Sequence, residues 1–133
     1  MSKRFVMDTG AITLFFAGDR RVTPYFDAIM EERAAGYVCS VNLAEYFYKT
    51  CQKLGFETAK IRYHQISARL QRVDTDENLS EAAGKEKCHN GKLSLADSFA
   101  LALARQMDAC LLTTDSELRE SKTINVKYFA IGK

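Results

Sequence analysis

Four acidic residues stand where short apolar stretches of the chain end or where a helix is expected to begin. Asp8 ends the segment FVMD, and Asp115 follows CLLTT. Glu45 lies in NLAEYF, and Asp97 lies in LSLADSFALALA, a segment that is apolar on nearly every side. Carboxylates gathered at one place could bind a divalent cation, so the question is whether the fold brings these four together.

Each acid also has an ordinary structural interpretation. Ser94 can cap a helix, which places Asp97 at its third position, where a carboxylate faces the positive end of the helix dipole and contributes about 0.3–1 kcal/mol. Asp8 can cap the helix that follows it, and Asp115 can cap the turn SELRE. Glu45 falls off the apolar stripe of its helix and can simply be solvated. Taken singly, these interpretations are as good as a functional one or better.

Taken together, the four acids would repel one another. Two unit charges about 4 Å apart repel by about 4 kcal/mol at an effective dielectric constant of about 20. The segments 38–48, 94–104 and 106–118 contain no lysine or arginine, so neighbours in the sequence do not neutralise the acids. A divalent cation would, and oxygen ligands without His or Cys favour Mg²⁺ or Mn²⁺ over zinc. The predicted metal ligands are Asp8, Glu45, Asp97 and Asp115.

Hydrophobic periodicity and the positions of Gly and Pro predict short strands that alternate with helices. The strands are predicted at Lys3–Asp8, Tyr37–Ser40, Arg72–Asp76, Asp108–Asp115 and Asn125–Gly132. The helices are predicted at Thr9–Gly18, Thr23–Gly36, Asn42–Gly55, Glu57–Arg72, Glu77–His89 and Lys92–Gln106. Thr23 is the expected N-cap of the second helix, with Pro24 in its first turn.

This alternation implies right-handed crossovers and helices on both faces of a parallel sheet. We therefore expect an α/β fold, a three-layer α/β/α sandwich with a parallel sheet of four to five short strands, as a single domain over residues 1–133. Ligands bind such sheets at the carboxyl ends of the strands. Asp8, Glu45 and Asp115 should meet at that edge, and Asp97 joins them if its helix begins there.

The composition excludes some classes of protein. The 133 residues are 47% hydrophobic, and no apolar run approaches the roughly 20 residues that span a bilayer. The segment MSKRFVMDTG has too short an apolar stretch for a signal peptide, so we expect a cytoplasmic protein without a membrane anchor. No two of the four cysteines form a CxxC pair, and Cys39 and Cys110 are expected to pack in the core.

The net charge of +2 does not by itself indicate a polyanionic partner. The stretch from Lys49 to Arg72 nevertheless contains six basic residues against one acid. This local excess could follow a phosphate backbone, or it could be a solvated helical face.

The segments FVMDTGAI, SVNLAEYFY, LSLADSFALALA and LLTTDSEL, in this order, resemble the four motifs of the PIN-domain family. The resemblance runs from Arg4 to Phe129, and the compact length is most similar to VapC-type toxins of toxin–antitoxin pairs. PIN domains are metal-dependent ribonucleases. The resemblance therefore implies an endoribonuclease that uses Mg²⁺ or Mn²⁺, with catalytic residues at Asp8, Glu45, Asp97, Asp115 and Thr113.

The implied reaction is hydrolysis of an RNA phosphodiester, in which the metal activates a water for in-line attack and Thr113 orients a ligand or water. His64 and His89 are expected at the surface and not as general bases. Many family members carry a further acid shortly after the fourth motif, and in the segment that follows Asp115 here only Glu117 could serve.

The resemblance also implies partners. Small PIN domains similar to this one usually dimerise, and Tyr46, Tyr48 and Phe56 are expected to be exposed for a homodimer contact. A cognate protein antitoxin is expected to insert a helix and a basic side chain near the acids.

Two other functions stay open. A non-catalytic PIN-like module would bind RNA or a partner protein without cleaving it. A receiver domain that accepts a phosphoryl group also combines a small parallel sheet with Mg²⁺ and acids at strand ends. It needs adjacent acids after the first strand, whereas Asp8 is followed by Thr9 and Gly10.

Overall fold

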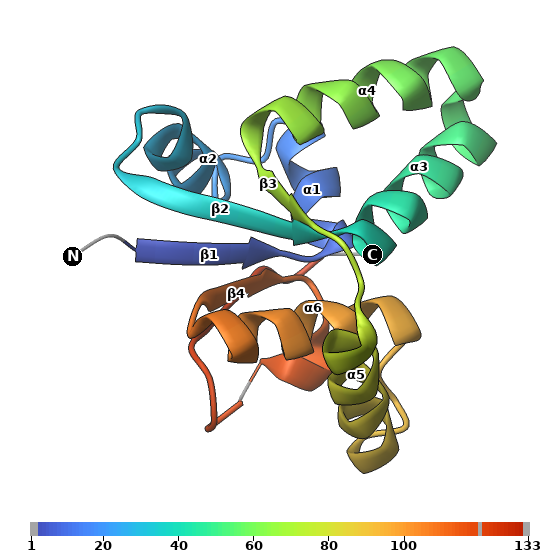
Figure 1. Cartoon of the computed structure of the whole chain (residues 1–133). Helices are drawn as coiled ribbons and strands as arrows, with labels where there is room; N and C mark the ends of the chain where they lie inside the picture. Colours follow the sequence, from blue (N-terminus) through green and yellow to red (C-terminus); the bar gives the residue numbers. More distant parts are fainter. Residues whose placement is uncertain (1–2, 120, 132–133) are drawn as a thin grey trace.

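The computed structural model describes residues 3–119 and 121–131 (Figure 1). Five parallel strands form one sheet in the order β3-β2-β1-β4-β5. The strands are β1 (Lys3–Met7), β2 (Ala34–Cys39), β3 (Gln71–Val73), β4 (Cys110–Thr113) and β5 (Val126–Tyr128). The helices of this part of the chain are α1 (Thr9–Phe16), α2 (Thr23–Met30), α3 (Ser40–Leu54), α4 (Phe56–Arg69), α5 (Glu77–His89), α6 (Leu95–Met107) and the short 3-10 helix η1 (Ser116–Leu118). The predicted α/β fold with a parallel sheet is confirmed.

Helices cover both faces of the sheet (Figure 1). The side chains of β1 alternate between the two faces: Phe5 and Met7 pack in the core on the side of α1–α4, and Val6 packs in the core on the side of α5 and α6. Strands that are buried on both faces explain why these segments read as continuous apolar runs.

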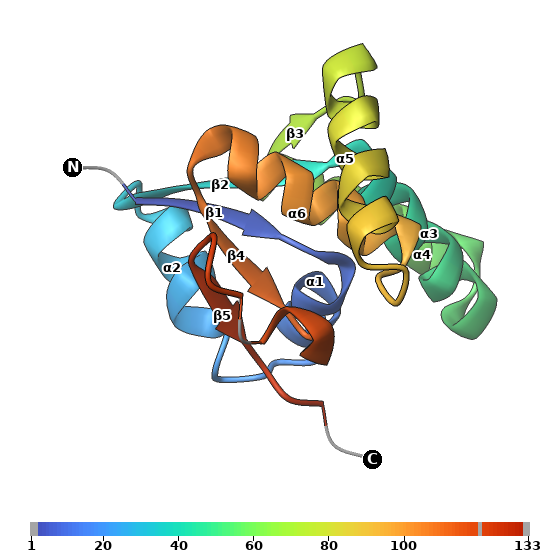
Figure 2. The ribbon, with the colours of Figure 1, turned by 90° about the horizontal axis from the view of Figure 1, so that it is seen from below.

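The order of the strands reverses between β1 and β4. The chain builds β1, β2 and β3 in one direction and then returns to place β4 on the other side of β1. Figure 2 shows the arrows of β1 and β4 side by side. Because right-handed crossovers in opposite directions lie on opposite faces, this reversal explains the two helical layers. In such sheets, ligands usually bind at the carboxyl ends of the strands where the strand order reverses, which here is between β1 and β4.

The predicted helix Thr23–Gly36 is wrong in its second half. Helix α2 ends at Met30, Glu32 takes a left-handed backbone (φ 60°), and β2 already begins at Ala34. Gly36 is a strand residue that pairs with Phe5, and a Cβ there would lie 2.5 Å from Ile29 Cδ1. This glycine allows α2 to lie close to β2 and does not end a helix.

The ends of two other elements differ by a few residues from the predicted ends. Helix α4 ends at Arg69, because Leu70 is extended and Gln71–Val73 pair with β2 as β3. The last strand ends at Tyr128, and Gly132, where that strand was predicted to end, lies outside the described residues.

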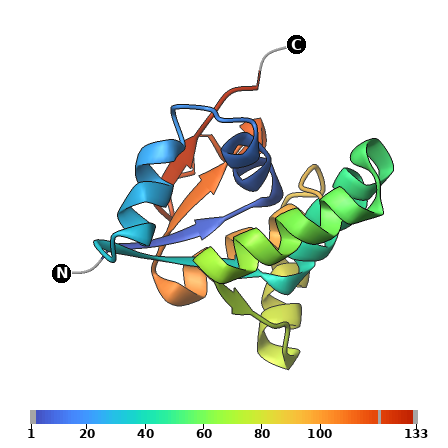
Figure 3. The same cartoon turned by 90° about the horizontal axis from the view of Figure 1, so that it is seen from above.

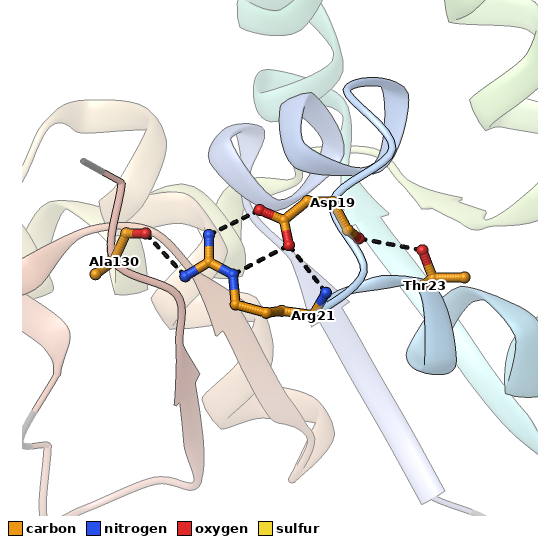
Figure 4. Close-up of polar contacts among 4 residues, drawn as sticks. All are labelled: Asp19, Arg21, Thr23 and Ala130. Atoms are coloured by element: carbon orange, nitrogen blue, oxygen red, sulfur yellow. Dashed lines mark hydrogen bonds and ion pairs between the residues drawn. The ribbon is translucent and has the colours of Figure 1, made fainter. Parts of the chain in front are cut away.

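Thr23 is not the N-cap of α2. Val22 occupies that position, and the Thr23 hydroxyl donates to the Asp19 carbonyl oxygen at 3.1 Å (Figure 4). In the same loop, the Arg21 guanidinium forms an ion pair with Asp19 at 2.7 Å and donates to the Ala130 carbonyl oxygen at 2.9 Å (Figure 4). Hydrogen bonds from Arg21 lower the pKa of Asp19 to about 2. The loop between α1 and α2 thereby holds the segment that follows β5.

Helix α4 lies alongside α3, and the two are joined at Gly55 (Figure 3). Of the aromatics that were expected to be exposed there, Tyr46 is buried (2% exposed) because its ring stacks on Phe16. Tyr48 and Phe56 are exposed, at 49% and 55%. The expected exposure is therefore wrong for Tyr46 and confirmed for the other two.

The remaining expectations concern cysteines, histidines and the membrane. Cys39 is buried and Cys110 is half-buried, and both contact the core. His64 and His89 are exposed, as expected. Within the described part of the chain, no helix combines the length and the apolar character that a bilayer-spanning segment needs.

Candidate active site

Asp8 is buried directly after β1 and uses both oxygens of its carboxylate. Oδ1 accepts from the backbone N–H of Ala11 at 2.8 Å, so Asp8 is the N-cap of α1. Oδ2 accepts from the hydroxyl of Thr113 and, at 3.3 Å, from the backbone N–H of Thr114. Burial raises the pKa of Asp8 to about 6, although these hydrogen bonds favour the ionised form and oppose the rise. The predicted cap exists, and the same carboxylate is bound to the end of β4.

Asp97 is the third residue of α6, as predicted from Ser94. The Ser94 hydroxyl oxygen accepts from the backbone N–H of Asp97 at 3.0 Å. Burial, a hydrogen bond with Asp115 and the charges of Asp8 and Asp115 raise the pKa of Asp97 to about 7. The carboxyl groups of Asp8, Asp97 and Asp115 thus interact, and we call these three residues the aspartate cluster.

Asp115 reaches the cluster from the loop after β4. Its Oδ1 accepts from the backbone N–H of Glu117 at 2.9 Å, which caps η1 as predicted. Thr113 links Asp115 to the rest of the cluster, because its oxygen accepts from the backbone N–H of Asp115 at 2.9 Å while its hydroxyl donates to Asp8. The fully buried Thr113 therefore orients two of the three acids.

Glu45 lies one turn into α3 and has a cation of its own. Its Oε2 is 3.4 Å from Nζ of Lys49, four residues later on the same helix, and its side chain is 17% exposed. Glu45 is not among the groups that shift the pKa of Asp8 or the pKa of Asp97. The structure brings the aspartate cluster together, and Glu45 stands beside it with Lys49. Sequence reasoning counted Lys49 in the basic stretch but missed this ion pair, so the inference that sequence neighbours do not neutralise the acids is wrong for Glu45. The spacing of four residues is the ordinary signal for such a pair on a helix.

Glu45 and Asp97 line the same cleft, which has a volume of about 730 Å³. Three cations line it too, Lys49, Lys53 and Arg62. Arg62 lies over the ring of Phe16, 5.3 Å from its centroid, and so sits against an apolar wall. Acids and cations therefore face one open space. A larger hollow of about 900 Å³ at the opposite, amino-terminal edge of the sheet contains none of the four predicted acids.

Two residues that sequence reasoning passed over shape this site. Gly10 lies in the first turn of α1, where a Cβ would come within 1.9 Å of Thr114 Oγ1. Only a residue without a side chain lets α1 approach the end of β4 so closely. Asn42 is fully buried in the first turn of α3, and its amide joins α3 to Thr9 and Ala96. A polar residue within an apolar helical stripe is the signal that could have found it.

Glu117 contributes its backbone N–H to Asp115, and its side chain is exposed. Glu117 thus contacts the acids through its backbone N–H, and its exposed carboxylate is not part of the cluster.

The chemistry of the aspartate cluster fits a hard cation. Its donors are carboxylate oxygens with the Thr113 hydroxyl beside them, and within residues 3–119 and 121–131 no ion pair joins its members to a Lys or Arg. Burial is the main cause of the raised pKa values of Asp8 and Asp97, and the charges of the neighbouring carboxylates add to it. In the same part of the chain, no three His, Cys, Asp or Glu side chains are close enough to form a finished ligand set.

Known structures share the whole fold. VapBC2 from Rickettsia felis, bound to a DNA fragment from its promoter, is similar with a TM-score of 0.78 at 13% identity, over 95% of this chain and 98% of that chain. A toxin–antitoxin complex from Klebsiella pneumoniae gives 0.69 at 15% identity, over 95% and 98%. VapC20 from Mycobacterium tuberculosis, a toxin that cleaves the sarcin–ricin loop, gives 0.71 at 17% identity, over 92% and 98%.

No curated protein sequence matches this chain. The profile of the PIN domain, in contrast, matches residues 5–122, which include all four predicted acids and Thr113. The match covers most of the chain and agrees with the topology and with the motifs from which the resemblance was drawn. The chain belongs to the PIN domain family.

Proposed function

We propose that this protein is a metal-dependent endoribonuclease that hydrolyses RNA phosphodiesters and acts as the toxin of a toxin–antitoxin pair. The observation that carries the proposal is the aspartate cluster, which stands without a cation partner in the described residues at the point where the strand order reverses. The adjoining cleft, lined by Lys49, Lys53 and Arg62, suits a polyanionic substrate. The proposed catalytic residues are Asp8, Glu45, Asp97, Asp115 and Thr113.

The aspartate cluster and Glu45 would hold one or two Mg²⁺ or Mn²⁺ ions. When bound, such ions lower the pKa of a coordinated water and stabilise the charge that develops on the phosphate. The side chains would have to turn toward the ion, because they do not form a finished ligand set at present. Glu45 would have to leave Lys49, and this surface ion pair is cheap to break, at about 0–1 kcal/mol.

The chain's own residues account for the other requirements of the reaction. The three cations of the cleft would bind the phosphates of the RNA on either side of the scissile bond. Lys49, which is the cation paired with Glu45, would contact the scissile phosphate once it is released from that pair. Thr113 would keep the carboxylate of Asp8 in one orientation through the hydroxyl hydrogen bond.

Cleavage of RNA by an Asp115→Asn variant tests the proposal. Asparagine keeps an oxygen that can cap η1, so the fold should persist while the charge is lost. We expect Mn²⁺-dependent cleavage to fall by at least about 100-fold, a change of ~2.7 kcal/mol in the barrier. Asp27→Asn, an exposed acid on α2, is the matched control and should cleave like the wild type. Undiminished cleavage by Asp115→Asn, or cleavage that persists in EDTA, would contradict the proposal.

Lys53→Gln tests the cleft separately. Removing one phosphate contact should raise KM for RNA and reduce the salt dependence of binding by about one counterion, while leaving kcat nearly unchanged. Lys85→Gln, an exposed cation on α5, is its control. Equal effects from both variants would show that the cleft does not bind RNA.

A protein antitoxin is the proposed partner, as in the Klebsiella pneumoniae toxin–antitoxin complex. A helix that carries an arginine or lysine into the cleft would neutralise the aspartate cluster and block the site. Co-expression with the protein encoded immediately upstream should yield a stable complex without RNase activity. Recovery of this chain alone, fully active, would contradict this part of the proposal. With this role we also propose that the protein acts in the cytoplasm and forms a homodimer.

The non-catalytic module is the second candidate, because the described residues contain no finished ligand set. It predicts RNA binding in the cleft with no uptake of Mn²⁺ by the aspartate cluster. A calorimetric titration with Mn²⁺ separates the two functions. The match to the PIN domain favours either of them over a receiver domain.

A further inference from the structure

We propose that Asn42 is a positioning residue that sets the spacing of three of the four acid-bearing segments, those that carry Asp8, Glu45 and Asp97. The inference rests on the proposed metal-dependent function. Asn42 lies in the first turn of α3 and is completely buried. It is neither an acid nor part of the aspartate cluster, so its action on the site is indirect.

The side-chain amide of Asn42 contacts two other segments. Its Nδ2 donates to the hydroxyl oxygen of Thr9 and to the backbone carbonyl oxygen of Ala96, each at 3.2 Å. In return, the Thr9 hydroxyl donates to the backbone carbonyl oxygen of Asn42 at 3.4 Å. One amide therefore joins the first turns of α1, α3 and α6.

Each contact lies next to an acid in the sequence. Thr9 directly follows Asp8, and Ala96 directly precedes Asp97. Asn42 itself stands three residues before Glu45 on α3, which is slightly less than one helical turn. The bonded residues are 33 and 54 positions apart along the chain, so local structure cannot hold these segments in place. The amide joins them through the side-chain hydroxyl of Thr9 and the backbone carbonyl of Ala96.

Stability alone does not account for an asparagine at this position. Its Oδ1 is buried and has no hydrogen-bond partner among the described residues. A buried acceptor without a partner is unfavourable, and an apolar side chain of similar size would avoid that cost. An apolar residue could not form the two hydrogen bonds that Nδ2 donates to the segments of Asp8 and Asp97. The amide is thus better suited to fixing geometry than to packing.

Fixed backbones matter here because the carboxylates do not yet form a complete ligand set. Their side chains must reorient to bind an ion, so the placement of the helix starts preorganises the site together with the Thr113 hydrogen bonds to Asp8 and Asp115. Groups behind the direct ligands typically change metal affinity or activity by about 10- to 100-fold when they are removed. Asn42 would act in this way while touching neither metal nor RNA.

The test is an Asn42→Leu variant, which keeps a side chain of similar size and removes both donors. Mn²⁺ affinity is measured by calorimetry on the full chain, and thermal unfolding is measured without metal. We expect the metal-free melting temperature to stay near that of the wild type while the Mn²⁺ dissociation constant rises by at least about tenfold. At saturating RNA, kcat should fall by a similar factor with KM little changed. Asn42→Ala, which also lacks the donors, should shift Mn²⁺ affinity in the same direction.

Ser67→Ala is the matched control. The Ser67 hydroxyl on α4 is also buried and has no hydrogen-bond partner within residues 3–119 and 121–131, but it does not join the acid-bearing segments. This variant should bind Mn²⁺ like the wild type.

Three results would overturn the inference. Wild-type Mn²⁺ affinity and kcat in Asn42→Leu would show that the amide does not position the acids. Loss of cooperative unfolding in metal-free Asn42→Leu would assign Asn42 to the stability of the fold. Failure of the wild type itself to take up Mn²⁺ would remove the proposed function and this inference with it, whereas the first two results leave the proposed function standing.

Discussion

Asp97→Asn distinguishes a helix cap from a metal ligand by the sign of its effect on stability. Asparagine has nearly the same size as aspartate, and Ser94, the actual N-cap of α6, is unchanged. The substitution therefore removes mainly a charge. If Asp97 serves only the helix dipole, metal-free stability should fall by up to about 1 kcal/mol. If repulsion within the aspartate cluster dominates, metal-free stability should rise.

The magnitude follows from the pKa of Asp97, which burial, Asp115 and Asp8 raise from 3.8 to about 7. Because the folded state holds this proton more tightly than the unfolded state, the stability it confers is complete below pH 3.8 and is lost as the pH rises to about 7. Fully expressed, the loss would be ~4 kcal/mol, at about 1.36 kcal/mol for each pKa unit. Asp97 is only partly buried, so solvent screening reduces this to ~1–2 kcal/mol. After the lost dipole interaction of ~0.5 kcal/mol, a net gain of ~1 kcal/mol remains.

Thermal unfolding in EDTA at pH 8 and pH 4, followed by an RNase assay with Mn²⁺, measures this. We expect Asp97→Asn to melt about 3–5 °C above the wild type at pH 8. The two proteins should melt together near pH 4, where Asp97 of the wild type is mostly protonated. Added Mn²⁺ should stabilise only the wild type, and cleavage by the variant should fall at least about tenfold. A variant that is less stable at pH 8 and fully active would refute the reasoning, and Asp27→Asn controls for the loss of an exposed charge.

Three further predictions concern the neighbouring residues. Thr113→Val removes a hydrogen-bond donor to Asp8, so the pKa of Asp8 should rise above about 6 and the free energy of unfolding at pH 8 should fall by ~1–3 kcal/mol. An NMR titration of the Asp8 carboxyl identical to that of the wild type would contradict this. Gly10→Ala places a Cβ 1.9 Å from Thr114 Oγ1 and should cost ~1–3 kcal/mol in urea unfolding, and wild-type stability would show that the contact is soft. Phe56→Glu, at an exposed aromatic of α4, should turn a dimer into a monomer by light scattering at tens of micromolar (roughly where modest interfaces persist). A monomeric wild type under these conditions would rule out the dimer.

The parts of the site that could be predicted are those that depend on local structure. A cap depends on a short side chain with an oxygen and on the helix that follows it, and the predicted caps by Ser94, Asp8 and Asp115 exist. Thr23, which was predicted as a cap away from the site, is not one. The end of α2 could not be predicted in this way. Residues 34–36 continue a helical pattern, but pairing with β1 draws them into a strand. Tertiary hydrogen bonds outweighed a local preference there.

By itself the sequence determined the alternation of strands and helices and the parallel sheet. It also determined that each of the four acids lies at the end of a strand or near the start of a helix. Apolar periodicity, glycine positions and caps act over a few residues, so these patterns can be read from the sequence without knowing the tertiary structure. Only the tertiary structure decided which acids meet. Asp8, Asp97 and Asp115 interact because β4 inserts beside β1, whereas Glu45 pairs with Lys49. Contacts between residues far apart in the chain, such as those of Asn42, exist only once the chain has folded, because no local pattern specifies their partners.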